Sequence, residues 1–236
     1  MPVLSGDGLR STTRAVPWLP LLAAAAIATA LVAARLEQNA ALPLQMAAVL
    51  LASGLGYALD DPAFEVVGAS PTSIGRRRMH RLTLAIPPAA LLFTALLAWH
   101  GTAGSGETLA LLAMFSGLVG LALGIAGVSA RRSPRGLGGI AVAPTLFAAL
   151  ILSTMLTPRW RPLPIGDIPG GWPPIIARWS AAAVIGLAVF AISSRDPAAR
   201  RIVRRRPDPS SPTSLPRRGD RGAARPPGRR RAASAR

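Results

Sequence analysis

The sequence predicts an all-α polytopic membrane protein with six transmembrane helices, both termini in the cytoplasm and a disordered basic C-terminal tail. Half of the 236 residues are apolar, and only 5% are aromatic. Six apolar stretches of about 17 to 23 residues each match the length that crosses roughly 30 Å of hydrocarbon at 1.5 Å per residue. The charged residues gather in the segments between them. The predicted spans are residues 15–34, 40–59, 82–99, 108–130, 137–156 and 174–194.

The distribution of Arg between the two sides of the membrane predicts the orientation. Outside the C-terminal tail, nine Arg fall on one side of six alternating spans and four on the other. Because positively charged connections stay in the cytoplasm, the first side is cytoplasmic, and both termini lie there. We therefore expect a multi-pass protein of the cytoplasmic membrane. Its parts are a cytoplasmic N-terminus (1–14), a six-helix transmembrane domain (15–200) with a cytoplasmic insert (60–81), and a disordered tail (201–236).

The first span has some features of a secretory signal peptide. Arg10 and Arg14 precede an apolar run that starts at Trp18, and small residues follow at 30–34. The run is longer than the usual signal-peptide core of about 7–15 residues. The second span also follows after a connection of only a few residues, as in a helical hairpin. Retention as a transmembrane helix is therefore favoured over cleavage.

The second and third spans are joined by an unusually polar insert, LDDPAFEVVGASPTSIGRRRMHR. Asp61 followed by Pro62 is typical of a helix N-cap and first helical position. Glu65, near the first turn, favours the positive end of the helix dipole. The pattern predicts a short cytoplasmic helix from Pro62 to about Val67, with Phe64 and Val67 on one side.

The remainder of the insert predicts the start of the third transmembrane helix. Ser70 and Pro71 have the composition of a helix start. A cluster of basic residues then precedes the apolar span at Leu82, and we expect it to lie at the anionic lipid headgroups. This cluster consists of Arg76, Arg77, Arg78 and Arg81.

The fourth span carries a stripe of small residues. Four glycines recur at spacings of three, four and three residues, which places them on one face of a helix and lets another helix approach closely. That face can pack within the chain or form a dimer, and the sequence leaves both open. The stripe consists of Gly117, Gly120, Gly124 and Gly127.

The fifth and sixth spans are joined by the longest connection on the outer side. Its prolines and glycines predict a compact loop that either lies at the interface or re-enters the membrane. Trp160 and Trp172 are expected at the membrane–water interface. Arg178 lies about one turn inside the last span, where its long side chain can extend outward to the interface.

The C-terminal tail is strongly basic and poor in apolar residues. Residues 195–236 contain 14 Arg and three Asp. Such a segment cannot bury enough apolar surface to offset the entropy of ordering the chain, so we expect disorder. It has no aromatic residue to stack on bases, and stacking is the usual device for single-stranded nucleic acid. We therefore expect attraction to membrane lipids and no nucleic-acid binding.

The residue types that are missing exclude several classes of enzyme. The chain has no Cys, which removes disulfides, thiolate nucleophiles and Cys-ligated metals. All 27 basic residues are Arg, and a P-loop ATPase needs a Lys on the nucleotide phosphates. His80 and His100 fall on opposite sides of the membrane, and the adjacent Asp60 and Asp61 do not face each other on a helix. We predict no catalytic residues, no metal site and no cofactor.

The arrangement resembles the membrane-spanning permease subunits of ABC transporters of the type-two exporter class. Those proteins have six spans, both termini inside, a cytoplasmic coupling helix between the second and third spans, and a re-entrant element before the sixth. The segment ALDDPAFEVVGASPTSIGRRRMHR is also similar to small actinobacterial ABC permeases. The resemblance is one of topology over residues 15 to about 200, and the basic tail lies outside it.

The resemblance implies that a separate ATP-binding subunit docks on the insert. Two permeases, identical or different, would then move against each other, and export is the direction that the family implies. The lack of ionisable residues in the middle of the spans favours a hydrophobic cargo over ions. The docking residues implied by the resemblance are Asp60, Asp61 and Pro62, which would fix the helix start, and Phe64, Glu65 and Val67, which would contact the ATPase.

A second class of function is compatible with the same sequence. The chain can be a non-transporting membrane scaffold or assembly factor whose Arg-rich tail binds anionic lipid or partner proteins. That hypothesis predicts that removal of residues 207–236 abolishes function while the insert tolerates change. The transporter hypothesis predicts the opposite result.

Overall fold

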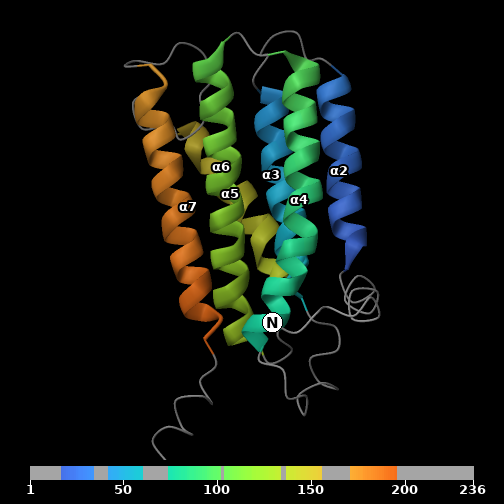
Figure 1. Ribbon diagram of the computed structural model, residues 1–236, viewed down its shortest axis with the longest axis vertical. Helices are drawn as coiled ribbons and strands as arrows, with labels where there is room; N and C mark the ends of the chain where they lie inside the picture. Colours follow the sequence, from blue (N-terminus) through green and yellow to red (C-terminus); the bar gives the residue numbers. More distant parts are fainter. Residues whose placement is uncertain are drawn as a thin grey trace, which may run out of the picture. The chain divides into compact units, whose positions relative to one another are not determined.

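A computed structural model of the chain describes residues 17–34, 42–60, 74–101, 104–133, 137–155 and 171–195. These residues form helices and short helix ends, with no strand among them, which confirms the predicted all-helical class for this part of the chain. Figure 1 shows the helices running side by side. They are α2 (Trp18–Ala33), α3 (Leu42–Tyr57), α4 (Ile74–His100), α5 (Ser105–Arg132), η1 (Gly139–Ala141), α6 (Val142–Met155) and α7 (Pro173–Ser193).

Each predicted span coincides with one observed helix. The third helix extends furthest beyond its predicted span: α4 begins at Ile74 and carries the Arg-rich segment in its first two turns, in line with the helix start predicted before these Arg. Three helices, α4, α5 and α7, are long and apolar enough to cross a membrane. The other apolar helices are shorter; the 16 residues of α2 extend about 24 Å at 1.5 Å per residue.

Successive helices run in opposite directions along the bundle. The beginning of α4, at Gly75, lies against the end of α7, at Ser194. The end of α3, at Tyr57, lies against Gly139 of η1, which leads into α6. α5 and α7 are parallel, because Gly106 faces Trp172 near their starts and Gly127 faces Ser193 at their ends. This alternation is the up-and-down arrangement found in many helical bundles.

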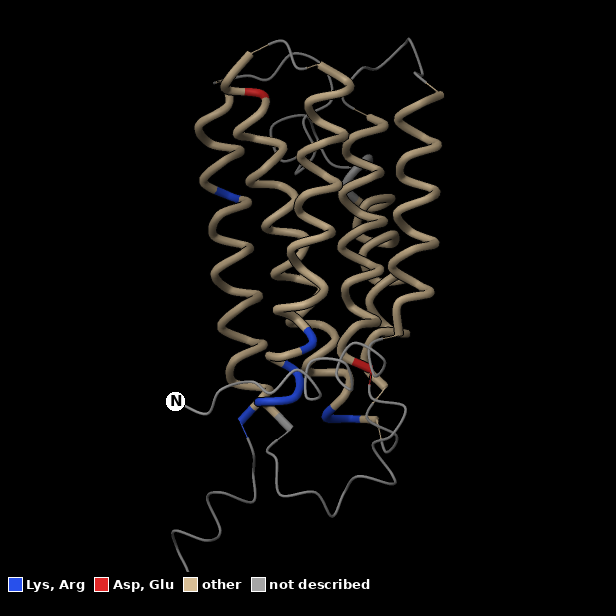
Figure 2. The backbone as a smooth tube through the Cα atoms, turned by 45° about the vertical axis from the view of Figure 1, so that its right-hand side comes forward, with Lys and Arg blue, Asp and Glu red and all other residues tan. Residues whose placement is uncertain are grey.

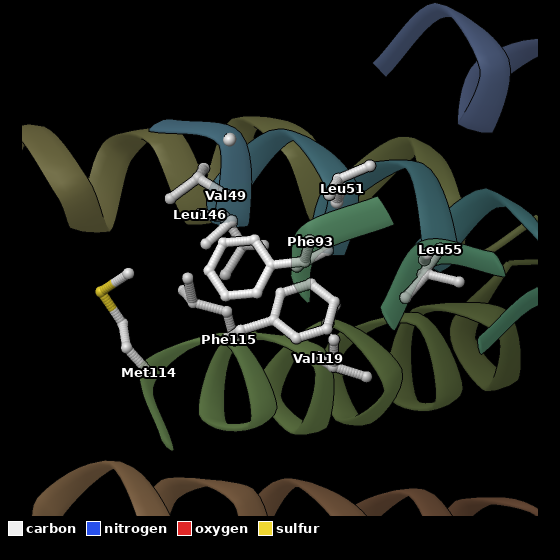
Figure 3. Close-up of a cluster of buried hydrophobic side chains, with 14 of the residues drawn as sticks. Val49, Leu51, Leu55, Phe93, Met114, Phe115, Val119 and Leu146 are labelled. Carbon is white, nitrogen blue, oxygen red and sulfur yellow. The ribbon is translucent and has the colours of Figure 1, made fainter. Parts of the chain in front are cut away.

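The core lies where α3, α4 and α5 meet. α3 is buried along nearly its whole length, which its many small residues permit. Phe93 of α4 stacks on Phe115 of α5, with ring centroids 4.5 Å apart and an interplanar angle of 16°. Figure 3 shows these two rings packed among Leu51 and Leu55 of α3 and Val119 of α5. Aromatic stacking and close packing both fix the positions of α4 and α5 around α3.

The glycine stripe of α5 packs against α7 of the same chain. A Cβ atom added at Gly120 would lie 2.8 Å from the Cα of Ala183, and one at Gly117 would meet the ring and backbone of Trp179. Gly124 faces Gly186 in the same way. The backbones of the two helices therefore approach more closely than any side chain on this face allows. Of the two arrangements that the sequence left open, the structure has the contact within the chain.

The outer faces of the helices are apolar. Large hydrophobic side chains are exposed on α2, α4, α5, α6 and α7. A monomeric protein in water rarely exposes so much contiguous apolar surface. Together with the three long apolar helices, this exterior indicates a protein associated with a membrane. The most exposed of these side chains are Leu19, Leu22, Leu91, Ile151, Leu152, Val184 and Ile185.

Candidate functional site: the junction at the Arg-rich end of the bundle

The Arg residues of the described segments gather at one end of the bundle, which we call the Arg-rich end. Figure 2 shows this grouping, with a single Arg closer to the opposite end. The exception is Arg178, which lies in the second turn of α7, near its start. The residues at the Arg-rich end are Arg76, Arg77, Arg78, Arg81, Arg131, Arg132 and Arg195.

Asp60 connects the end of α3 to the beginning of α6. Its Oδ1 accepts hydrogen bonds from the backbone N–H groups of Gly138 and Gly139, at 2.6 and 2.7 Å. Those amides precede and begin η1, where the first N–H groups of a helix have no partner within it. The side chain is 7% exposed, so these hydrogen bonds face little competition from solvent. A negative charge is also stabilised at the positive end of a helix.

Arg81 ties α4 into the same junction. Its Nη1 donates a 2.6 Å hydrogen bond to the backbone carbonyl of Asp60, and the side chain is only 6% exposed. The carbonyl belongs to the turn that ends α3, where backbone oxygens lack helical partners and a cation is favourable. Asp60 therefore links three elements. It follows the end of α3, it accepts a hydrogen bond from Arg81 of α4, and it accepts two from the start of η1.

Glycine is required where η1 meets the rest of the junction. A Cβ atom at Gly139 would lie 2.6 Å from the Cα of Tyr57 and 2.8 Å from Oδ2 of Asp60. One at Gly138 would lie 2.1 Å from the carbonyl oxygen of Ala126. Both positions are close approaches of backbone to backbone, which only glycine permits. This packing brings the two amides within reach of the Asp60 carboxylate.

The end of α7 is held by a second Arg. Arg131 lies near the end of α5, and its Nε donates a hydrogen bond to the carbonyl of Ser193. Its Nη2 donates to the carbonyl of Ile192 at 2.7 Å and to that of Arg195 at 2.8 Å. One guanidinium thus satisfies three carbonyls at the C-terminal end of the helix, where a cation also interacts favourably with the dipole. Arg131 therefore couples the ends of α5 and α7.

Substitution Arg131→Gln is expected to loosen the last turn of α7. The exposed position limits the loss of free energy to about 1 kcal/mol, since only part of the charged hydrogen bonding survives solvent screening. Amide exchange in a peptide covering the end of α7 is expected to become about fivefold faster by hydrogen–deuterium exchange mass spectrometry. Arg132→Gln is the matched control, because Arg132 is the exposed next residue of the same helix. Equal exchange in the two variants would contradict the capping role.

The six residues predicted to form the docking insert fall into two groups. Asp61, Pro62, Phe64, Glu65 and Val67 lie outside the described residues. Asp60 is buried in the junction, so its side chain faces the interior of the bundle and not the surface on which a partner would dock.

The four Arg of α4 also divide, two on the outside and two on the inside. Arg76 is exposed and Arg77 is half-buried. Arg78 and Arg81 are buried, at 9% and 6% exposure, and the headgroup contact expected of the four Arg stays a prediction. The physical reason for the division is helical periodicity, because residues three apart share one face. That face of α4 points into the bundle.

Sequence reasoning missed Gly138, Gly139 and Arg131. The Gly-Gly pair at the start of the fifth apolar stretch could have indicated this junction, because adjacent glycines at a helix start permit close backbone approach. The hydrogen bond between Gly138 and Asp60 could not be predicted from the sequence, because 78 residues separate the two. Arg131 was counted for orientation only, and nothing local to it indicates that its partners lie on α7.

The described residues carry no group of three His, Asp or Glu side chains placed to hold a metal ion. Comparison of the chain with protein-family models, with curated proteins and with solved structures gives no match. Function is therefore inferred from the geometry of the junction and from the composition of the chain.

Proposed function

We propose that the chain is the membrane-spanning permease subunit of an ABC transporter, with six spans in the cytoplasmic membrane and both termini in the cytoplasm. The alternating directions of the apolar helices support this topology. The shorter helices would be accommodated by local thinning of the bilayer and by their flanking residues. The orientation is supported by Arg: seven of the eight in the described residues lie at the Arg-rich end, which the positive-inside rule assigns to the cytoplasm.

The observation that carries the proposal is the junction around Asp60. In the chain, the predicted coupling insert follows Asp60 directly and precedes the first turns of α4. Its first flank is bonded to η1 and to Arg81. Its second flank, at Gly75, lies against the end of α7. A force applied to the insert would therefore reach α3, α4 and α6 through short, buried hydrogen bonds, and α7 through the half-buried contact of Gly75 with Ser194.

The division of labour between subunits follows from composition. The chain has no Lys for a P-loop, so ATP would be hydrolysed by a separate subunit that docks on Phe64, Glu65 and Val67. Closure of two such ATPases would displace the inserts of two permeases. A transition of this kind requires rigid helices that repack as units, because closely packed interfaces switch between discrete arrangements. The middle parts of the described helices carry no acidic or basic residue, which favours a hydrophobic cargo.

Substitution Phe64→Asp is expected to break the docking of the ATPase. A charge placed in an apolar contact without a partner costs several kcal/mol, so the affinity of the two subunits is expected to fall at least a hundredfold. The measurement is co-purification in detergent of the full chain with its ATP-binding subunit, followed by ATP hydrolysis in lipid vesicles. Insertion of the variant into the membrane is expected to be normal, since Phe64 lies in the polar insert.

Removal of residues 207–236 is the control that separates the two classes of function. The transporter hypothesis predicts normal co-purification and hydrolysis without the tail. The scaffold hypothesis predicts that the tail deletion abolishes function while Phe64→Asp has no effect. A Phe64→Asp variant that keeps a normal complex and normal ATP-driven transport would reject the assigned docking face.

A further inference from the structure

An apolar groove runs along the outside of the bundle between α4, α5 and α7. Its volume is about 700 Å³, within the range of roughly 300–1,000 Å³ that is usual for ligand sites. The wall from α4 includes Met79, Leu82 and Ile86, and the wall from α7 includes Leu187 and Phe190. The groove is thus suited to a hydrocarbon chain.

One cationic side chain lines the end of the groove, and a second lies on the same face of α4 nearby. Gly75 and Ser194 close its end, where a Cβ at Gly75 would lie 2.9 Å from the carbonyl of Ser194. Arg195 follows directly and lines the groove. Arg76 lies three residues before the lining residue Met79 and seven before Thr83, so it shares their face of α4.

Both of these Arg residues are available to a ligand. Their side chains are exposed. Neither guanidinium donates a hydrogen bond to another described residue, in contrast to that of Arg131 nearby. An apolar groove beside two guanidinium groups that have no hydrogen-bond partner among the described residues complements a molecule with a hydrocarbon chain and an anionic head. Basic pockets between membrane helices bind phosphate-bearing lipid headgroups for this reason, and Arg pairs well with phosphate oxygens.

We infer that this groove binds one anionic phospholipid, with an acyl chain between α4 and α7 and the phosphate at Arg76 and Arg195. A zwitterionic lipid would fill the apolar part equally well but gains less from the two cations. The site needs only that the chain lie in a bilayer, so it does not depend on the proposed transport activity. It is also distinct from the general attraction of the basic tail, because its apolar walls belong to α4, α5 and α7 and it shares only Arg195 with the tail.

Lipid retention tests the inference directly. The full chain is reconstituted in nanodiscs with equal amounts of phosphatidylglycerol and phosphatidylcholine, released in mild detergent, and weighed by native mass spectrometry. One phosphatidylglycerol per chain is expected to remain in excess over phosphatidylcholine. The double variant Arg76→Gln, Arg195→Gln is expected to reduce this preference about 25-fold, since each basic residue contributes about a fivefold factor near an anionic surface. Arg132→Gln is the charge control and is expected to keep the preference.

A second pair of variants tests the apolar part of the site. Ala191→Phe fills the groove, since Ala191 lines it, and is expected to reduce the retention of both lipids severalfold. Ala188→Phe places the same ring on an exposed position of α7 outside the lining and is expected to change nothing. The charge variants alter only exposed side chains, so a folding defect in Ala191→Phe leaves the test intact.

Three results would overturn the inference. Equal retention of the two lipids by the parent chain would mean that the cations select nothing. An equal loss in Arg132→Gln would reduce the effect to general surface charge. Crosslinking of two chains through a single Ala191→Cys, unaffected by added phosphatidylglycerol, would show that a second copy occupies the groove; the chain has no Cys of its own to confuse this result.

Discussion

Replacement of Gly186 by Leu is expected to force α5 and α7 apart. A Cβ at this position would lie 2.2 Å from the carbonyl carbon of Gly120, 2.3 Å from its oxygen and 2.6 Å from the amide nitrogen of Leu121. All three are backbone atoms, so no side chain can rotate away and the helices themselves must move. The expected loss is at the upper end of overpacking effects, about 3 kcal/mol. Unfolding of the purified chain in mixed micelles, followed by circular dichroism, measures it.

The matched control is Ala188→Leu, two residues further along α7. Ala188 is exposed on the apolar exterior, where a larger side chain meets no neighbouring helix. Its stability is expected to stay within about 0.5 kcal/mol of the parent chain, as for most surface changes. Equal stability of Gly186→Leu and Ala188→Leu would show that α5 and α7 do not pack through their glycines.

Replacement of Asp60 by Ala is expected to disconnect α3 from α6. The variant leaves the buried amides of Gly138 and Gly139 without their acceptor, and each lost hydrogen bond to a charged group costs about 1.5–3 kcal/mol. Relief of the buried charge offsets part of this cost, so the net loss is expected to be about 3 kcal/mol. The stability is measured as for Gly186→Leu. Amide exchange at the two glycines, followed by nuclear magnetic resonance, is expected to accelerate about a hundredfold.

The conservative variant Asp60→Asn separates hydrogen bonding from charge. Its carbonyl oxygen can accept both N–H groups in place of Oδ1, so the expected loss is under about 1 kcal/mol. If Asp60→Asn and Asp60→Ala lower the free energy of unfolding equally, then the charge of Asp60 stabilises the junction and the two hydrogen bonds do not. If neither costs anything, then the N-terminal end of α6 is held in place by packing alone.

The helices were predictable because the signal for each is local. An apolar stretch long enough to cross the hydrocarbon is read directly from composition, and the observed helices coincide with all six stretches. The continuation of α4 into the Arg-rich segment was predictable as well, since helix-starting residues precede the four Arg in the sequence. The sequence could not indicate which Arg turns inward. That depends on the face of α4 that the other helices cover, and it places Arg78 and Arg81 inside while Arg76 stays exposed.

The candidate site was predictable only in part, for a similar reason. The insert after Asp60 stood out as a polar segment in an apolar chain, but its anchoring depends on residues far away in the sequence. Asp60 meets Gly138, and Arg131 meets Ser193, across 78 and 62 residues. Neither partnership follows from local spacing or propensity. Each exists because two helix ends with unsatisfied backbone groups meet at one end of the bundle.

Residue types and local patterns alone predict that this protein is helical and rich in long apolar stretches, that its basic residues are all Arg, and that the chain lacks the Lys of a P-loop. Those properties depend on residue type and on distances of a few turns along the chain. The folded bundle was needed to show that the glycines of α5 face α7, that Asp60 joins α3 to α6, and that an apolar groove lined by Arg195 runs between α4 and α7. The physical reason is that close backbone approach, capping of helix ends and groove formation are properties of pairs of helices, and pairing is a property of the folded bundle.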